Sequence, residues 1–581
     1  MIIDLIAHNM APIMFAALVV FLLLGYPVAF SLAFVGISFG ILGIWLGELD
    51  THLFGLLPER MWGIMSNDTL LAIPFFTFMG LILERSGMAE DLLDTVGQLF
   101  GPIRGGLAYA VVFVGALLAA TTGVVAASVI AMGLISLPIM LRYGYDRRLA
   151  SGVIAASGTL AQIIPPSLVL IIMADQLGRS VGDMYAGAFI PGIVLAVLYA
   201  VFVLIVTIVR PEAAPALPIE ARTLGSGVIS LFVTVAIVTA IAFVVTELLR
   251  GHMQGPEIGG VFAAVLVAYV FALANRILKL NLLSRLAQQA IIVLMPPLAL
   301  IFLVLGTIFI GLATPTEGGA MGAVGALLLA MAKGRLNLSL TKQALESTAK
   351  LSAFVLFILI GARVFSLTFY GVDGHKWVEE LLIDLPGGQI GFLIVVNLLV
   401  FVLAFFLDFF ELAFIVVPLL GPVAEKLGID LIWFGVLLGI NMQTSFMHPP
   451  FGFALFYLRS VAARTPYKDK ITGAVIQPVT TGQIYWGAVP FVCIQVIMVG
   501  LAIGVPQMIM HYKSGLSTVD PATIEITLPP SNSEGTGLEQ APDYGTPPDL
   551  SQPPDLSQPP DLSQPPDLSQ PPDLSQPPKI E

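Results

Sequence analysis

Two breaks in long apolar stretches carry the side chains best suited to bind a ligand. Each contains a double proline, within residues 162–167 and residues 441–452. Proline removes a backbone donor and clashes with the preceding turn, so each pair should interrupt a helix and free several carbonyl groups. In hydrocarbon, such groups are tolerated only where they are buried in protein or line a polar cavity. The candidate residues are Gln162, Pro165, Pro166 and Ser167 in the first break, and Asn441, Gln443, Thr444, Ser445, His448, Pro449, Pro450 and Gly452 in the second.

The paired breaks predict a transport protein, because interrupted helices in corresponding halves of a chain are typical of a transporter's binding site. The second break is the stronger candidate, since packing alone does not explain so many hydrogen-bonding side chains in an apolar helix. His448 could carry a proton there or serve only as a hydrogen-bond partner.

A pair of threonines interrupts apolar sequence 43 residues before the first double proline, counted from Thr122 to Pro165. Neither flank of Thr121-Thr122-Gly123 is long enough to span a bilayer alone, which predicts a re-entrant hairpin with its tip at the threonines. Hydroxyl and free carbonyl oxygens at such a tip would suit Na⁺. The alternative is that the hydroxyls bond only to their own helix.

Two carboxylates hold the corresponding place 41 residues before the second double proline, counted from Asp408 to Pro449. Asp408 and Glu411 are three residues apart, so on a helix they would share one face. In the otherwise uncharged stretch 400–418, they must be neutralised by a cation, protonated, or exposed at a water-filled tip. We therefore weigh a coupling-ion or proton site equally against a structural ion pair with Arg363.

Three landmarks recur in the same order in the two halves of the chain: a proline-containing entry, a polar tip and a double proline. The distance from Pro27 to Pro165 is 138 residues, and the distance from Pro315 to Pro449 is 134 residues. This agreement predicts an internal duplication of ~140 residues. The offsets alone leave parallel and inverted repeats open, and the fold class we expect is the inverted one.

The composition places these segments in an all-α polytopic membrane protein. Of the 581 residues, 57% are hydrophobic and 11% are charged, and the mean hydropathy is +0.93. Soluble domains carry about twice that share of charged residues. Apolar runs of bilayer-spanning length recur as far as about residue 510. Clear examples are 12–24, 108–120, 189–209, 226–247, 259–275, 290–313, 391–407 and 484–505.

The chain divides into four parts. Residues 1–210 and 288–512 form the two halves, and residues 211–287 form a two-span insertion that should face lipid or a partner subunit. Residues 513–581 contain five copies of Pro-Pro-Asp-Leu-Ser-Gln and hold 11 acidic and 2 basic residues, which accounts for most of the net charge of −12. Such a composition predicts a disordered tail. The basic cluster 142–148 should be cytoplasmic by the positive-inside rule.

Several function classes are excluded by what the sequence lacks. It contains no Gly-x-x-x-x-Gly-Lys-Ser/Thr loop, no Cys-x-x-Cys and no His-Glu-x-x-His, and its one cysteine is Cys493. We therefore expect neither an enzyme nor ATP hydrolysis, no cofactor and no nucleic-acid partner. Energy must come from an ion gradient or another subunit.

Several separate strings resemble the large membrane subunit of TRAP (tripartite ATP-independent periplasmic) transporters. They are residues 75–87 (FFTFMGLILERSG), 145–156 (YDRRLASGVIAA), 164–167 (IPPS), 312–317 (LATPTE) and 428–436 (GIDLIWFGV). The resemblance covers about residues 10–210 and 288–505.

The resemblance implies a Na⁺-driven importer of carboxylates in the bacterial inner membrane, with Na⁺ as the coupling ion. It implies an elevator mechanism with two hairpins and two broken helices. It also implies two partners, a small four-helix membrane subunit and a soluble periplasmic substrate-binding protein. Carried over by motif, Thr122, Gly123 and Ser128 lie at the first hairpin tip and Asp408 at the second, with Na⁺ near Thr122, Gly123 and Asp408. Thr314 and Thr316 belong to one of the strings that resemble the family, residues 312–317, so we include them in the candidate site.

The chain departs from the family pattern at three places. Val124 and Val125 replace two hydroxyl residues at the first tip, His448 replaces a threonine, and Leu-Asp-Phe-Phe-Glu replaces Leu-Asp-Pro. These changes suggest a bulkier or non-dicarboxylate organic acid. One alternative is a stand-alone Na⁺- or H⁺-coupled carboxylate transporter. A membrane subunit of an ion-pumping redox complex is disfavoured, because the spans contain almost no lysine.

Overall fold

The computed structural model describes residues 7, 9–225, 228–250, 256–449, 452–469 and 471–515. The predicted acidic tail from residue 516 onward lies outside the described residues, as do Pro450 and the side chain of Thr122. The described chain is helical except for its loops and one antiparallel pair of short strands, β1 (Tyr467–Lys468) and β2 (Val475–Ile476). This confirms the expected all-α fold class.

The first half contains ten labelled helices and three short 3₁₀ segments within the described residues. The helices are α2 (Met10–Leu23), α3 (Val28–Leu46), α4 (Leu57–Met65), α5 (Ala72–Arg85), α6 (Met88–Phe100), α7 (Gly106–Thr122), α8 (Val125–Arg142), α9 (Arg147–Thr159), α10 (Leu168–Gln176) and α11 (Val181–Val209). The 3₁₀ segments are η1 (Leu53–Leu56), η2 (Asp68–Leu71) and η3 (Leu160–Gln162).

The second half follows a similar order of elements. Its helices are α14 (Arg285–Phe309), α15 (Pro315–Ala332), α16 (Leu338–Gly371), α17 (Gly374–Ile383), α18 (Gly388–Leu403), α19 (Phe409–Glu411), α20 (Val417–Lys426), α21 (Leu431–Met442), α22 (Phe453–Val461), α23 (Thr481–Gly504) and α24 (Gln507–Met510). A π-helix, η6 (Leu412–Val416), joins α19 to α20, and the 3₁₀ segment η7 (Gln443–Phe446) follows α21. In each half, a helical hairpin is followed by an interrupted helix and then by one long helix.

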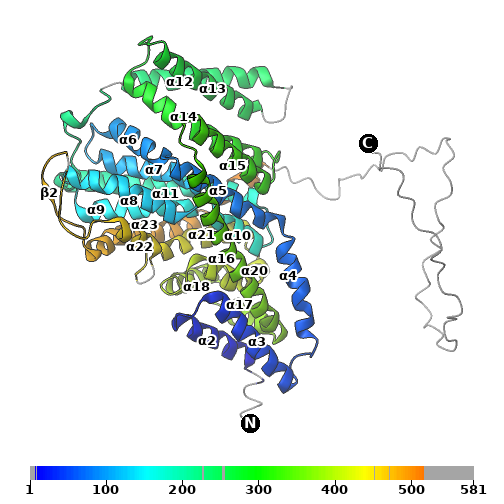
Figure 1. Ribbon diagram of the computed structural model, residues 1–581. Coiled ribbons are helices and arrows are strands. Elements are labelled where there is room, and N and C mark those ends of the chain that lie inside the picture. The colour runs from blue at the N-terminus through cyan, green and yellow to red at the C-terminus, as the bar shows by residue number, and fades with distance from the viewer. Residues whose placement is uncertain are drawn as a thin grey trace, which may run out of the picture. The chain divides into compact units, whose positions relative to one another are not determined.

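The insertion between the halves consists of α12 (Val228–Leu249) and α13 (Pro256–Ile277), which pack on one another and against α14 (Figure 1). Only 6% of the apolar window of α12 is buried inside the protein. An apolar helix with so little protein contact needs another apolar environment. The assignment of this face to lipid or to a partner subunit stays a prediction.

The length and composition of the helices are those of a multi-pass membrane protein. Among the described residues, eight helices are long and apolar enough to cross a bilayer, or up to ten if two bent helix pairs each count as one span. The most apolar of these helices is α11, which has 29 residues and a mean hydropathy of 3.0. At 1.5 Å per residue, α11 is about 43 Å long and can serve as a reference axis.

The two interrupted helices enter the protein from opposite ends of α11. At the end of α11, Asp146 N donates to the carbonyl of Ala213 (2.9 Å) immediately before α9 begins. At the start of α11, a Cβ atom on Gly187 would lie 3.2 Å from a methyl carbon of Ile432, in the first turn of α21. The helices α9 and α21 therefore run in opposite directions, which is the arrangement expected of inverted repeats.

Glycines allow several helix pairs to approach closely. A Cβ atom on Gly152 of α9 would lie 2.1 Å from the carbonyl oxygen of Gly487 on α23. In the same way, a Cβ atom on Gly361 of α16 would lie 2.5 Å from the carbonyl oxygen of Ala29 on α3. Small residues at such crossings give membrane helices their van der Waals contact area. These contacts fix α9 against α23 and α3 against α16.

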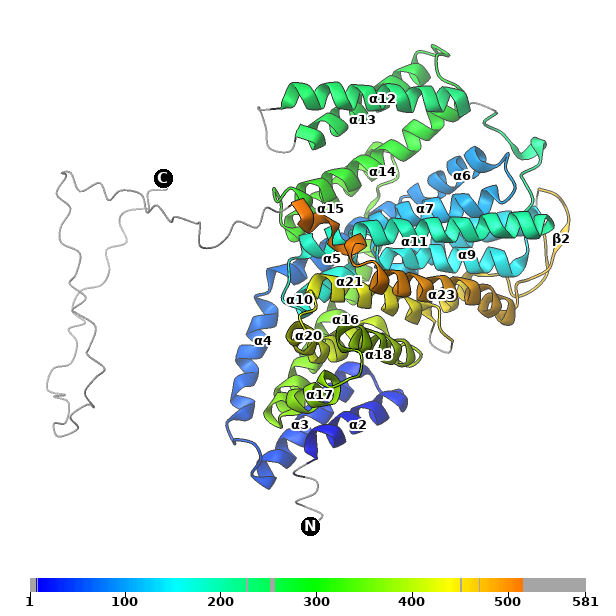
Figure 2. The same ribbon diagram turned by 180° about the vertical axis from the view of Figure 1, so that it is seen from behind.

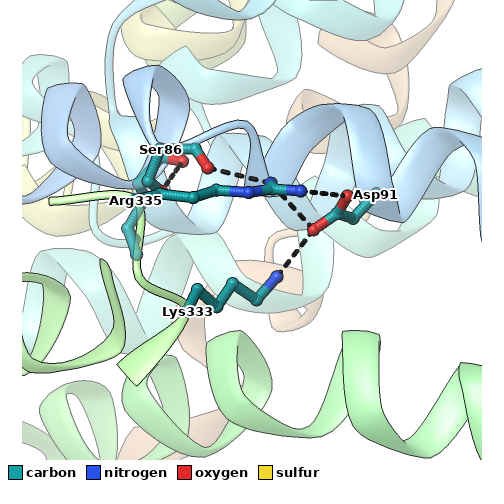
Figure 3. A network of polar contacts seen from close by, with 5 residues as sticks. Ser86, Asp91, Lys333 and Arg335 are labelled. Atoms are coloured by element: carbon teal, nitrogen blue, oxygen red, sulfur yellow. Dashed lines mark hydrogen bonds and ion pairs between the residues drawn. The ribbon is translucent and has the colours of Figure 1, made fainter. Parts of the chain in front are cut away.

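An ion-pair network joins the first turn of α6 and the residues before it to the turn between α15 and α16 (Figure 3). Arg335 binds the Asp91 carboxylate with both terminal nitrogens (3.0 and 3.1 Å) and donates to the carbonyl of Ser86 (3.0 Å). Lys333 Nζ reaches the same carboxylate at 2.9 Å. A bidentate arginine with a second cation is the strong form of such a pair, so the network ties the two halves together.

Candidate substrate and ion site

The first break contains a loop that is closed by its own serine. The helix α9 begins at the cap Asp146, continues into η3 and ends before residue 163, and α10 starts at Leu168. Ser167 Oγ donates to the carbonyl of Gln162 (2.5 Å) and accepts from Leu170 N (3.4 Å). The helix is therefore interrupted at Pro165 and Pro166, as their sequence predicts. The Ser167 hydroxyl hydrogen is already used inside the loop.

The first hairpin tip lies directly against this loop. The helix α7 ends at Thr122 and is followed by Gly123, which has a left-handed φ of +57°, and α8 begins at Val125. A Cβ atom on Gly123 would lie 3.0 Å from the carbonyl oxygen of Pro166, so the tip and the break are in contact. The Thr121 hydroxyl donates to the carbonyl of Leu118 (2.9 Å), and Ser128 is buried in the first turn of α8. Thr121 therefore follows the alternative in which a threonine bonds to its own helix.

The second break repeats this construction with more side chains. After α21, the segment η7 carries Gln443, Thr444 and Ser445, all buried, and α22 begins at Phe453. Thr444 and Ser445 donate to the carbonyls of Asn441 and Met442, each at 2.7 Å. Both hydroxyl hydrogens are therefore used within the helix, and only their oxygen lone pairs remain for a ligand.

Two contacts connect the second break to the second hairpin. Asn441 Nδ2 donates to the carbonyl (2.7 Å) and to Oδ1 (3.0 Å) of Asn397 on α18. The His448 ring stacks on Phe405 of the hairpin tip, with ring centroids 4.2 Å apart at 12°, and meets Phe401 edge to face at 4.5 Å. His448 is 3% exposed, and both ring nitrogens lack a hydrogen-bond partner among the described residues. Pro449 is exposed, and Gly452 is buried immediately before α22.

The carboxylates at the second tip form a capping box. Asp408 Oδ1 accepts from Glu411 N (2.9 Å), and Glu411 Oε2 accepts from Asp408 N (2.9 Å). The prediction that the two side chains share one helix face was wrong, because the helix begins only after Asp408. The alternative of an ion pair with Arg363 was also wrong, since no such pair occurs among the described residues. The π-helix η6, a feature often found at functional sites, follows directly.

The two breaks meet at Thr159, the last residue of α9. Gln443 Nε2 donates to the Thr159 hydroxyl (3.0 Å), and that hydroxyl donates to the carbonyl of Ala156 (2.8 Å). Gln495 of α23 reaches the same hydroxyl at 3.4 Å and donates to the Tyr199 hydroxyl of α11 at 2.9 Å. Both interrupted helices and both long helices therefore contribute to one buried polar cluster.

The family described as "Tripartite ATP-independent periplasmic transporter, DctM component" matches residues 15–284 and 253–508. The chain belongs to this family. The resemblance to the large TRAP subunit is thereby confirmed over both halves.

The curated relatives are large permease proteins of TRAP transporters. The chain is 29% identical to the C4-dicarboxylate permease DctM of Pseudomonas aeruginosa over 406 residues, which is 70% of this chain and 80% of that protein. It is 25% identical to the sialic acid permease SiaM of Vibrio cholerae, covering 75% and 86% of the two chains. It is 26% identical to the ectoine permease TeaC of Halomonas elongata, covering 87% and 99%. These names differ in substrate, so membership alone does not select one.

A structural comparison gives a weaker match. The YdaH transporter of Alcanivorax borkumensis is 15% identical with a TM-score of 0.47, and the match covers 78% of this chain and 88% of that chain.

Not every predicted site residue of this TRAP permease lies near the breaks. Thr314 caps α15 in a second capping box, with Glu317, and is exposed. Thr316 donates to the carbonyl of Asp68 in η2 (2.7 Å). Neither contacts the polar cluster around Thr159, and Pro450 and the Thr122 side chain lie outside the described residues. The Na⁺ and substrate roles of the other candidates stay predictions.

Asn397, Tyr199 and Gln495 take part in the buried polar contacts of the two breaks but were missing from the sequence prediction. A signal was available for two of them. Asn397 is the one amide in the apolar run 391–407, and Gln495 is the one amide in 484–505. A polar side chain inside a span is itself a functional hypothesis, so the criterion applied to the breaks would have found both.

Proposed function

We propose that this TRAP permease is the transport subunit of a secondary transporter that imports an organic anion bearing a carboxylate across the inner membrane. A Na⁺ gradient drives the import. A periplasmic binding protein delivers the substrate, and a small four-helix membrane subunit completes the assembly. The observation that carries the proposal is the meeting of two oppositely directed broken helices at Thr159, with a hairpin tip against each break.

The oxygen atoms of the two breaks support a Na⁺ site. Thr444 and Ser445 offer only lone pairs, because their hydrogens are used by their own helix. Three buried amide oxygens also have no donor among the described residues, and they are Oε1 of Gln162, Gln443 and Gln495. Acceptor oxygens beside unwound backbone are the ligands that Na⁺-coupled transporters use. These five oxygen atoms can accept but not donate a hydrogen bond, so they suit a cation.

The donors needed for a carboxylate lie on the other side of the second break. The helix α22 begins at Phe453, and the residue before it, Gly452, has no side chain that could cap the helix. The positive end of a helix dipole favours an anion. The unpaired ring nitrogens of His448 lie four residues earlier in the same break. Together they support a carboxylate bound between the second hairpin tip and α22.

An elevator movement is the mechanism that this arrangement supports. The interrupted helices and the long helices α11 and α23 share the buried cluster around Thr159, and each hairpin tip contacts one of the breaks, so these elements would move as one unit. The helices α2 to α5 and α14 to α16 would form the scaffold. The moving unit would carry substrate and Na⁺ together from one side of the membrane to the other.

The test is uptake in proteoliposomes that contain this chain and its two companion subunits. A panel of carboxylates is offered with and without an inward Na⁺ gradient. We expect concentrative uptake of one class only when the gradient and the binding protein are both present. Equal uptake without Na⁺ would contradict the coupling, and uptake by the chain alone would favour a stand-alone transporter.

A further inference from the structure

A large cavity lies at the end of the molecule opposite to the start of α21. Its volume is about 970 Å³, and it is formed by the start of α9, the end of α11 and the start of α23, which run side by side (Figure 2). The loop after α11 closes one side, where Ala213 accepts from Asp146 N. The substrate cluster is remote, because Thr159 lies at the far end of α9.

Positive charge gathers at the polar side of this cavity. Arg147, Arg148 and Arg210 line it, and none of the three forms a hydrogen bond or ion pair through its side chain with any described residue. The Nε of Arg147 is buried without an acceptor. Two carboxylates also line the cavity. Glu212 is exposed and forms no ion pair with any described residue, and Asp146 already accepts from Arg148 N (2.8 Å) and Leu149 N (3.0 Å) at the start of α9. The cavity therefore presents donors that lack an acceptor.

The opposite side of the cavity is apolar and faces outward. Ile205 and Val209 on α11 are 52% and 70% exposed, and Trp486 on α23 is 66% exposed. Tryptophan is enriched at the boundary between hydrocarbon and headgroups. The basic loops at this end should be cytoplasmic by the positive-inside rule, and Arg142, paired with Asp469 at 2.9 Å, belongs to them.

We propose that this cavity binds an anionic phospholipid of the inner leaflet. The phosphate would accept from Arg147, Arg148 and Arg210, and an acyl chain would lie along Ile205, Val209 and Trp486. A basic pocket between membrane helices on the cytoplasmic side is suited to such headgroups. A free phosphate ion could use the arginines but would leave the exposed apolar wall uncovered, so the lipid fits both sides of the cavity. Because the site lies on α9, α11 and α23, the lipid would travel with the unit proposed to move.

Native mass spectrometry of the full chain in neutral detergent tests the proposal. Phosphatidylglycerol and phosphatidylcholine with the same acyl chains are offered, and inorganic phosphate and glycerol phosphate are offered as competitors. We expect selective retention of phosphatidylglycerol that neither soluble phosphate displaces. The double substitution Arg148→Gln with Arg210→Gln should weaken binding roughly thirtyfold, since each arginine near the surface contributes about a factor of five.

Matched variants separate the cavity from general surface charge. Arg148→Lys with Arg210→Lys keeps the charge and should retain most of the binding. Arg104→Gln with Arg464→Gln removes two exposed arginines outside the cavity and should change binding little. A photoactivatable phosphatidylglycerol on the wild-type chain should label peptides of α9, α11 or α23, and this holds even if a variant fails to fold. Equal binding of phosphatidylcholine, complete displacement by phosphate, unchanged binding in the glutamine variant, or labelling elsewhere would each overturn the proposal.

Discussion

Asp408 contributes a charge and a hydrogen bond that substitution can separate. Its carboxylate caps the helix that begins at Phe409, and Glu411 returns the bond to its backbone. Asparagine caps helices about as well as aspartate, whereas alanine does not. Helix capping therefore explains why a residue such as Asp408 lies at the tip, but it does not require a negative charge. That charge remains available to bind Na⁺ or to interact with the bound substrate.

We predict that Asp408→Asn folds normally but strongly reduces Na⁺-dependent uptake. Asp408→Ala should lose uptake and, in addition, about 1 kcal/mol of stability through the missing cap. The measurements are uptake at varied Na⁺ concentration and thermal unfolding of both variants. If Asp408→Asn transports like the wild type, the residue is a cap and has no part in coupling.

His448 allows a similar separation between ring stacking and hydrogen bonding. We predict that His448→Phe keeps the stack on Phe405 and the fold, but raises the KM for the anion roughly ten- to a hundredfold, the effect of losing one hydrogen bond to a charged group. Phe405→Leu is the matched control, because it removes the stack and leaves the ring nitrogens. An unchanged KM in His448→Phe would place the carboxylate elsewhere.

At the scale of elements, α9 and α23 cross closely at the cavity that we assign to the lipid. A Cβ atom on Gly487 would lie 2.2 Å from the carbonyl oxygen of Arg148, whereas one on Gly500 of the same helix would meet nothing within 4 Å. We predict that Gly487→Val lowers stability by about 1–3 kcal/mol, the usual cost of overpacking, or prevents assembly. Gly500→Val makes the same change in helix propensity and should be tolerated. Fluorescence size-exclusion chromatography after heating measures how much folded protein remains in each variant. Equal amounts of folded Gly487→Val and Gly500→Val would contradict the close crossing of α9 and α23.

The elements also show what local sequence can and cannot predict. The helix breaks were predictable because proline acts on its own backbone, whatever surrounds it. The role of Asp408 was predictable in principle, since Asp-Phe-Phe-Glu has the spacing of a capping box, as has Thr-Pro-Thr-Glu at Thr314. The partners Asn397 for Asn441 and Thr159 for Gln443 were not predictable, because a pairing across 44 or 284 residues depends on how the helices pack.

At the scale of the whole molecule, the proposed movement requires contacts that break between scaffold and moving unit. One such contact is the hydrogen bond from Asn67 Nδ2, before η2, to Asp175 Oδ1 at the end of α10 (2.6 Å). By contrast, Arg179 pairs with Glu425 at 2.7 Å, and both residues belong to the unit that we propose to move. The two pairs lie at neighbouring helix ends. Cross-links at these two places can therefore distinguish a movement between the scaffold and the moving unit from a movement inside the moving unit.

We predict that a short, reducible cross-link between cysteines at 67 and 175 abolishes uptake, and that reduction restores it. Cross-linking Arg179→Cys to Glu425→Cys should leave uptake nearly unchanged, because those positions would travel together. Both pairs are built in a Cys493→Ser background, so that no native thiol reacts. Uptake that survives complete cross-linking of Asn67→Cys to Asp175→Cys would mean that α10 stays with the scaffold during transport. In that case the site would have to open by local movement of the hairpin tips instead of by an elevator.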